Sequence, residues 1–257
     1  MKVVLLAGGT GTRIAEESQY RPKPMVEIGG LPILWHIMKI YSHYGYNDFI
    51  ICAGYKQHMI KEWFADYYLH TSDITFSFKS GNGITVHDQK TEPWNVTVVD
   101  TGLNTMTGGR IKRIQKYIDG KPFFMTYGDG VCDVNIGELL DFHMKSGKKA
   151  TLTAVRVNQR FGVLDINKGS VRSFREKSSK DMDIINAGFM VLEPSVFDYL
   201  NDDKTVFEGT PLSKLAEEGE LASYLHDGFW QCMDNAYEQA QLKNLWESGE
   251  APWKVWE

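Results

Sequence analysis

Short, uninterrupted apolar segments alternate with amphipathic segments along the first half of the chain. Residues 2–8 (KVVLLAG), 48–54 (DFIICAG) and 94–102 (WNVTVVDTG) are short apolar runs, which are typical of strands buried on both faces of a parallel sheet. Between them, residues 32–45 and 56–70 place apolar side chains at helical spacing. Strands separated by helices in this way predict an α/β fold with a mainly parallel sheet.

Three further segments complete the first half. Residues 108–118 predict a helix, and residues 121–130 (KPFFMTYGDG) predict a strand that ends in an acidic turn. Residues 73–88 alternate apolar and polar side chains around a Ser-Gly-Asn-Gly turn, which predicts a β-hairpin.

The pattern changes after about residue 150. Apolar stretches then follow one another with few helices between them, at residues 150–155, 162–167, 170–177 and 185–194. Helical patterns return at residues 194–200, 211–219 and 235–249. These strands predict an antiparallel addition to the sheet, and because no linker or repeat divides the chain we expect one domain, residues 1–257.

Composition excludes several classes of partner. The chain has 257 residues and a formal net charge of −5, without a basic block, which argues against a nucleic-acid groove. No stretch reaches the ~18 apolar residues of a membrane span, and the apolar run near Lys2 is too short for a signal peptide. The three cysteines lack metal-ligand spacing, so we expect buried thiols in a cytoplasmic globular protein.

The glycine-rich turn after the first strand, residues 8–14 (GGTGTRI), is typical of a phosphate site. It does not match the GxxxxGK[ST] loop, and Ile14 stands where a GxGxxG dinucleotide turn needs its third glycine. A GGxGTR turn can still aim backbone N–H groups at phosphate oxygens. Arg13 would add a forked donor for a polyphosphate, although a tight turn with an incidental arginine remains open.

Lys23 lies between two prolines, Pro22 and Pro24. Proline restricts the backbone of its neighbours, so we expect Lys23 to be held in an extended conformation shortly after Arg13. This favours the interpretation that Lys23 binds the same anion as Arg13 over the interpretation that it is a freely solvated surface lysine.

Two acidic residues follow predicted strands. Asp129 lies between Gly128 and Gly130, which leave its carboxylate clear of neighbouring side chains, and Asp234 ends the run FWQCMD before a helix. Carboxylates at strand ends suit a hard divalent cation. A turn role for Asp129 and an N-cap role for Asp234 are the structural alternatives.

The sequence GGTGTR followed by RPKPM resembles the signature of the sugar-1-phosphate nucleotidylyltransferases. The resemblance runs nearly end to end, and further segments narrow it to members that use CTP and glucose 1-phosphate: MVEIGGLPILWHIMKIYSHYG, EPWNVTVVDTG, MTGGRIKR, YGDGVCDV and APWKVWE. It implies a Rossmann-like α/β fold whose mixed, mainly parallel sheet carries an antiparallel sugar-binding lobe. Residues 1–130 would mainly bind nucleotide, and residues 131–257 would mainly bind sugar phosphate.

The resemblance also implies an activity and a site. CTP and α-D-glucose 1-phosphate would give CDP-glucose and pyrophosphate, feeding deoxysugar and surface-polysaccharide synthesis, with Asp129 and Asp234 as Mg²⁺ ligands and with Arg13 and Lys23 as catalytic cations. Nucleotide contacts are expected from Leu6, Ala7, Gly8, Gly9, Thr10, Gly11, Thr12, Arg13, Lys23, Asn104, Thr107, Gly109 and Gly128. Sugar-phosphate contacts are expected from Glu176, Lys177, Asn186 and Gly188.

Two departures from the family pattern affect the acceptor side. Ser178 replaces the proline that usually follows the Glu-Lys pair, and Cys232 and Asn235 replace the usual surroundings of the second metal acid. An exposed ion pair at Glu176 and Lys177, or a strand bulge at Gly188, are the structural alternatives there.

Several functional alternatives therefore stay open. Another sugar 1-phosphate, UTP or dTTP would suit the same chemistry, although Asn104 and the carbonyls of its loop offer acceptors for the amino group of cytosine. A non-catalytic sugar-nucleotide sensor would be expected to lose a metal or phosphate ligand, which this chain keeps. A homo-oligomer is expected, with the hairpin at 73–88 as a plausible contact.

Overall fold

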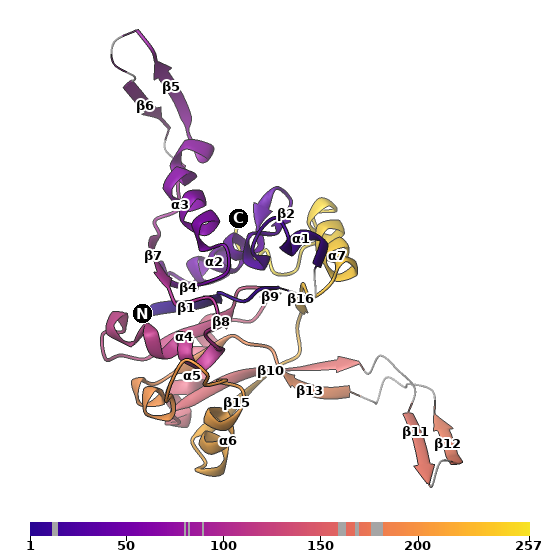
Figure 1. Ribbon diagram of the computed structural model, residues 1–257. Coiled ribbons are helices and arrows are strands. Elements are labelled where there is room, and N and C mark those ends of the chain that lie inside the picture. Colours follow the sequence, from indigo (N-terminus) through magenta and orange to yellow (C-terminus); the bar gives the residue numbers. More distant parts are fainter. Residues whose placement is uncertain are drawn as a thin grey trace.

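The computed structural model describes residues 1–11, 15–79, 81, 83–88, 90–158, 163–167, 170–175 and 182–257. Within these residues, eight strands form one central sheet, in which β15 pairs with β10 beside the path β13-β10-β14-β8-β1-β4-β7 (Figure 1). The strands are β1 (Lys2–Ala7), β4 (Asp48–Ala53), β7 (Asn95–Asp100), β8 (Phe123–Tyr127), β10 (Ala150–Asn158), β13 (Met182–Asn186), β14 (Met190–Leu192) and β15 (Leu221–His226).

The parallel half of the sheet confirms the prediction of parallel strands, although β7, at the end of the sheet, is partly exposed rather than buried on both faces. β1 pairs in parallel with both β4 and β8, and β4 pairs in parallel with β7. In this register Leu6 lies opposite both Cys52 and Tyr127. The carboxyl ends of these strands therefore meet at one edge of the sheet, where ligands of open α/β sheets bind.

Successive residues of β1 enter two different cores, as the period of a strand requires. Val3 and Leu5 pack in one core with α2 (Ile33–His43), and Val4 and Leu6 pack in the other with α4 (Thr107–Arg113). Helix α3 (Gln57–Thr71) lies on the α2 side and α6 (Thr210–Glu217) on the α4 side. The sheet is thus covered on both faces (Figure 1).

The second half adds the expected antiparallel strands, with one correction. β14 runs antiparallel to β8 and β10, and β13 runs antiparallel to β10. The single strand predicted at 185–194 is wrong, because Gly188 at φ +79° and Phe189 at φ 40° break it into β13 and β14. The apolar pattern also did not predict β15, which pairs in parallel with β10.

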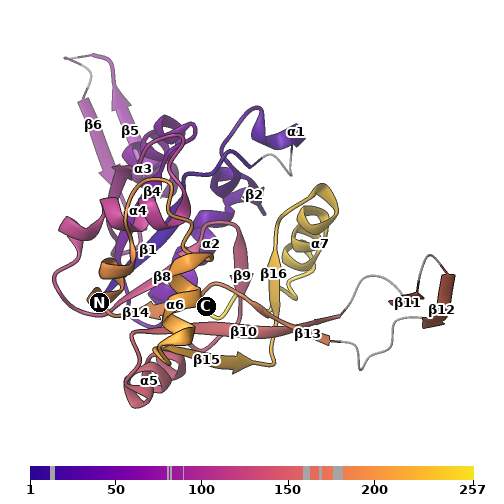
Figure 2. The ribbon, with the colours of Figure 1, turned by 60° about the horizontal axis from the view of Figure 1, so that its bottom comes forward.

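Two hairpins stand apart from the central sheet. β5 (Asp73–Ser77) and β6 (Gly83–His87) form the predicted hairpin, which extends beyond α3 (Figure 1). β11 (Val163–Asn167) and β12 (Ser170–Arg175) pair only with each other among the described residues, so these predicted strands do not join the central sheet (Figure 2).

The remaining helices and short strands fill out the predicted outline. The segment 194–200 forms a 3₁₀ helix, η4 (Pro194–Tyr199), and 235–249 forms α7 (Ala236–Glu247). The sequence pattern missed α5 (Ile136–Ser146). The other short elements are α1 (Ala15–Ser18), η2 (Lys23–Met25), β2 (Glu27–Ile28), β3 (Leu31–Pro32), β9 (Gly130–Cys132), η3 (Gln115–Tyr117) and β16 (Trp230–Cys232). The extended backbone predicted at Lys23 is wrong, because Lys23 begins the 3₁₀ helix η2, in which the N–H of Met25 donates to the carbonyl of Pro22 at 2.8 Å.

The segment after α7 docks on α2 through an aromatic cluster. Trp253 is fully buried, and its indole Nε1–H donates to Nδ1 of the fully buried His36 at 3.4 Å. Since Nδ1 accepts, Nε2 carries the hydrogen and donates to the carbonyl of Ile28 at 2.9 Å. Burial lowers the pKa of His36 to about 4, so this imidazole is neutral in the folded chain.

Two further predictions concern the class of protein. Among the helices described, none combines the length and apolar character needed to cross a bilayer. The three cysteines are free thiols, with Cys52 and Cys132 buried as expected, whereas Cys232 is only half-buried.

Candidate active site

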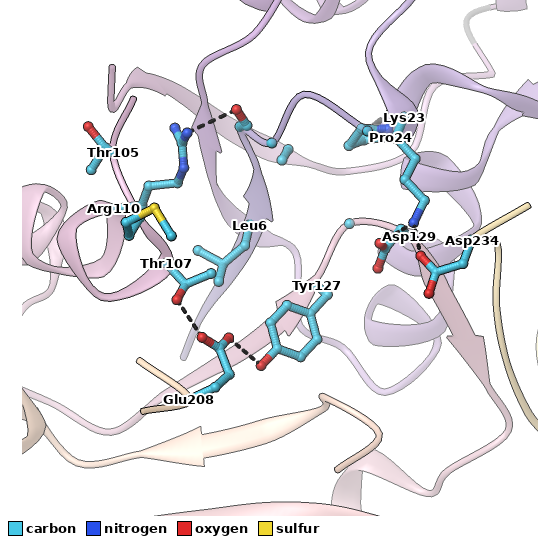
Figure 3. A pocket seen from close by; sticks show the side chains of 16 residues that line it. Leu6, Lys23, Pro24, Thr105, Thr107, Arg110, Tyr127, Asp129, Glu208 and Asp234 are labelled. Atoms are coloured by element: carbon cyan, nitrogen blue, oxygen red, sulfur yellow. Dashed lines mark hydrogen bonds and ion pairs between the residues drawn. The ribbon is translucent and has the colours of Figure 1, made fainter. Parts of the chain in front are cut away.

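A cavity of about 550 Å³ opens at the carboxyl edge of the parallel strands. It lies where the glycine-rich turn leaves β1 and where β8 ends (Figure 3). Its lining consists of Leu6, Ala7, Gly8, Gly9, Gly11, Lys23, Pro24, Thr105, Met106, Thr107, Arg110, Tyr127, Gly128, Asp129, Glu208 and Asp234.

The two ends of the cavity differ in chemistry. Lys23, Asp129 and Asp234 gather at one end (Figure 3). At the other end lie Arg110 and Glu208, with the Tyr127 ring between Glu208 and the two aspartates (Figure 3). Among the described lining residues, the first end therefore carries two carboxylates and an ammonium, and the second end carries one carboxylate and a guanidinium.

Short strands bring the two aspartates together. Asp129 directly precedes β9 and Asp234 follows β16, and these strands pair antiparallel with Gly130 opposite Cys232. The N–H of Met233 also donates to the carbonyl of Asp129 at 2.9 Å. The backbone therefore fixes the two carboxylates at one place, although they lie far apart in the sequence.

Asp234 does not cap the helix that follows it. The N-cap of α7 is Asn235, whose side chain accepts from the N–H of Glu238 at 2.9 Å. The carboxylate of Asp234 points to Lys23 instead, while its own N–H donates to Glu238 at 2.6 Å. Asn235 thus has a structural role that a threonine at this position could also fill.

Lys23 lies between the two carboxylates. Its side chain is nearly buried, and Nζ donates to Asp129 Oδ2 at 2.6 Å and to Asp234 Oδ1 at 2.5 Å. Burial alone would lower the pKa of Lys23, but the two carboxylates outweigh it and raise the pKa above its ordinary value. The ammonium is therefore charged, and it neutralises part of the acidic pair.

Arg110 shapes the other end of the cavity, although no feature of the sequence singled it out. Arg110 is 4% exposed, and its guanidinium donates to the carbonyls of Gly8 and Gly102 and to Thr101 Oγ1, at 2.9, 2.8 and 2.7 Å. Burial lowers the pKa of Arg110 from its usual value. A Cβ on Gly8 would lie 2.0 Å from Arg110 Nη1, so any larger residue there would have to displace the guanidinium.

Most residues expected to bind nucleotide line the cavity, and some do not. Leu6, Ala7, Gly8, Gly9, Gly11, Lys23, Thr107 and Gly128 do so. Thr10 and Asn104 are exposed and lie outside this lining. Gly109 packs against Asp203 instead, and a Cβ on Gly109 would lie 2.6 Å from the Cα of Asp203. Thr12 and Arg13 lie outside the described residues.

Neither of the expected sugar-phosphate residues that the structure describes lines the cavity, but both lie beside Tyr127, which does. Asn186 lies beside Tyr127, with Nδ2 3.5 Å from the phenol oxygen, and its Oδ1 accepts from the N–H of Gly188. A Cβ on Gly188 would lie 2.9 Å from the Tyr127 ring, so glycine allows this close approach. Glu176 and Lys177 lie outside the described residues, as does Ser178.

Comparisons with known proteins identify the family of this chain. Residues 2–233 match the sequence model of the nucleotidyl transferases, and the chain belongs to this family. It is 57% identical over 258 residues to the glucose-1-phosphate cytidylyltransferase of Salmonella typhimurium, covering 100% of both chains. It is 44% identical over 257 residues to the probable glucose-1-phosphate cytidylyltransferase of Bacillus subtilis, again covering 100% of both.

Solved structures confirm the fold. HddC from Yersinia pseudotuberculosis superposes with a TM-score of 0.68 at 24% identity, covering 95% of this chain and 99% of its own. A UDP-glucose pyrophosphorylase in complex with UDP-glucose gives the same TM-score at 15% identity, covering 96% and 98%. The Rossmann-like α/β fold with a mainly parallel sheet is therefore established.

Proposed function

We propose that this chain transfers the cytidylyl group of CTP to α-D-glucose 1-phosphate, giving CDP-glucose and pyrophosphate. The observation that carries the proposal is the Asp129–Lys23–Asp234 cluster, which lies in one cavity with the glycine-rich turn. The names and the full-length similarity of the relatives support the choice of substrates. The product is an activated sugar of the kind that polysaccharide synthesis consumes.

The chemistry needs charge compensation more than it needs a reactive side chain. An oxygen of the sugar phosphate attacks the α-phosphorus of CTP in line, and the bond from that phosphorus to the pyrophosphate oxygen breaks. Two polyanions must meet, and like unit charges ~4 Å apart repel by roughly 4 kcal/mol at an effective dielectric of 20. Lys23 supplies positive charge at the charged end of the cavity, and Arg13 would add to it.

The donor set fits Mg²⁺. Asp129 and Asp234 offer hard carboxylate oxygens. Because their side chains are about one third exposed, a metal that they held would remain accessible to the phosphate oxygens of a bound substrate. When bound, Mg²⁺ supplies charge that stabilises the triphosphate and the departing pyrophosphate. Lys23 now bonds to oxygens of the same carboxylates, so metal loading would free its ammonium to contact phosphate.

The acceptor is bound from the second half of the chain. Asn186 and Gly188 lie beside Tyr127, which lines the cavity, although neither of them lines it directly. Glu176 and Lys177 would complete the contacts to the sugar and its phosphate. Residues 1–130 are thus the mainly nucleotide-binding half of a single domain, and residues 131–257 the mainly sugar-phosphate-binding half.

The protein acts in the cytoplasm as a homo-oligomer. The β5–β6 hairpin supports the second part of this statement, because it extends from the body and exposes Phe76, Phe78 and Ile84 by 52, 81 and 51%. Exposed apolar side chains gathered on one element are typical of a protein–protein contact.

A competition assay tests the proposed substrates. CTP, UTP and dTTP are supplied together at equal concentration with each of several hexose 1-phosphates, and the sugar nucleotides are separated and quantified. CDP-glucose should dominate in the presence of Mg²⁺. Preferential use of UTP or dTTP would contradict the cytidylyl assignment, whereas CTP with a different sugar would contradict only the acceptor.

A further inference from the structure

Glu208 is a cavity carboxylate that the proposed chemistry does not use. It lies in the segment that precedes α6, on the opposite side of Tyr127 from the two aspartates (Figure 3). Its Oε1 accepts from the phenol of Tyr127 at 2.6 Å, and its Oε2 accepts from Thr107 Oγ1 at 2.5 Å. Thr107 is itself fixed, because its hydroxyl accepts from the N–H of Phe207 at 2.9 Å.

These contacts hold the Glu208 carboxylate without neutralising it. Among the described residues, no lysine, arginine or histidine forms an ion pair with Glu208. Arg110, at the same end of the cavity, directs its guanidinium to Gly8, Gly102 and Thr101. A fixed negative charge opposes the binding of a polyanion, unless the ligand offers it a hydrogen-bond donor.

The position of Glu208 indicates which part of the ligand it meets. In the proposed reaction the phosphates lie at the end with Lys23, so the part of the cavity open to the nucleoside is the end lined by Thr107, Arg110 and Glu208 (Figure 3). An ionised carboxylate only accepts, and its two oxygens offer about four lone-pair sites, of which Tyr127 and Thr107 use two. Acceptor sites therefore remain for a donor on the nucleoside.

We propose that Glu208 accepts a hydrogen bond from a donor group of the bound nucleoside and thereby sets nucleotide selectivity. This inference rests on the proposed nucleotidyl transfer and adds the residue that reads the nucleoside. The donor is either the exocyclic amine of cytosine, where uracil presents a carbonyl, or a ribose hydroxyl. Both sources share one chemistry, an N–H or O–H aimed at a fixed carboxylate.

The test replaces the carboxylate with an amide of nearly the same shape. Wild type and Glu208→Gln are compared with CTP, UTP, 2′-deoxy-CTP and 3′-deoxy-CTP, by kcat/KM at saturating glucose 1-phosphate and by calorimetric Kd without the sugar. Loss of a hydrogen bond to a charged group changes affinity by about 10- to 100-fold. If the cytosine amine is the donor, the ratio of kcat/KM for CTP to that for UTP should fall by this factor. If a ribose hydroxyl is the donor, the ratio of kcat/KM for CTP to that for one of the two deoxy-CTP analogues should fall instead.

Two matched variants separate selectivity from structural damage. Glu217→Gln makes the same change at an exposed position of α6 outside the cavity lining, and it should leave every ratio unchanged. Tyr127→Phe keeps the ring but removes one anchor of Glu208, so it should shift the same ratio in the same direction by less.

The outcomes distinguish this inference from the proposed function. If Glu208→Gln lowered kcat/KM and affinity equally for all four nucleotides, or for none of them, the proposed role of Glu208 would be overturned. Wild-type protein that turns over none of them would overturn the proposed function, and the calorimetric comparison would still decide whether Glu208 reads the nucleoside.

Discussion

Replacing Lys23 with methionine removes the ammonium that lies between Asp129 and Asp234 while keeping an apolar stem of similar length. The lost contacts are two charge-assisted hydrogen bonds of 2.6 and 2.5 Å. Removing one partner of a fully buried ion pair costs about 3–5 kcal/mol. Because the aspartate side chains are 32 and 28% exposed, solvent screens them, and we expect a loss of about 2 kcal/mol in the free energy of unfolding.

The same substitution should strengthen metal binding to the free protein. Asp129 and Asp234 no longer share their oxygens with an ammonium, so divalent metal ions should stabilise Lys23→Met more than wild type. Urea unfolding with and without Mn²⁺ measures both effects. Turnover should nevertheless fall by about 10²–10³, because one preorganised cation is lost from the triphosphate.

An exposed lysine provides the control for this prediction. Lys145→Met, on α5, should change neither stability nor metal response. If Lys23→Met is as stable as wild type and gains nothing from Mn²⁺, then Lys23 does not neutralise the acidic pair, and the electrostatic account of this end of the cavity is wrong.

Three further predictions concern stability. The pKa of His36 is lowered from 6.5 to about 4, so as the pH falls the imidazole is protonated in the unfolded chain before it is protonated in the folded chain. The free energy of unfolding should therefore fall by about 3 kcal/mol between pH 6.5 and pH 4. Urea unfolding at a series of pH values should show a weaker pH dependence of stability for His36→Gln. Asn235→Ala should cost about 1 kcal/mol through the lost N-cap, and Asn235→Thr much less, as thermal unfolding would show. Gly8→Ala should displace the Arg110 guanidinium, which lies 2.0 Å from the position of the new Cβ, and should lower both stability and nucleotide affinity. Gly9→Ala, whose Cβ would meet nothing within 4 Å, should fold normally. Equal stability of the two glycine variants would contradict this prediction.

Hydrophobic patterning predicted the elements better than their order. The runs at β1, β4 and β8 are uninterrupted because both sheet faces are covered. No local pattern places β14 between β8 and β10, since strand order is a long-range property. Helix α5 was missed although its ends were readable, with Asn135 as N-cap and Gly147 at φ 62° as C-cap.

The candidate site was predictable where local chemistry marks it. The flanking prolines pointed to Lys23, and the flanking glycines pointed to Asp129. The pairing of Asp129 with Asp234, in contrast, came from the family resemblance. The structure explains that pairing through β9 and β16. Arg110 and Glu208 escaped prediction, because each acquires its role only from partners that are distant in the sequence.

Isotope-labelled CTP reveals which phosphorus atom the sugar phosphate attacks. The enzyme is incubated with glucose 1-phosphate, Mg²⁺ and CTP that carries ³²P at either the α or the γ position, and the products are separated. Attack at the α-phosphorus predicts that the α label enters CDP-glucose and that the γ label leaves in pyrophosphate. Label from the γ position in the sugar product, or no sugar nucleotide at all, would contradict cytidylyl transfer by this chain.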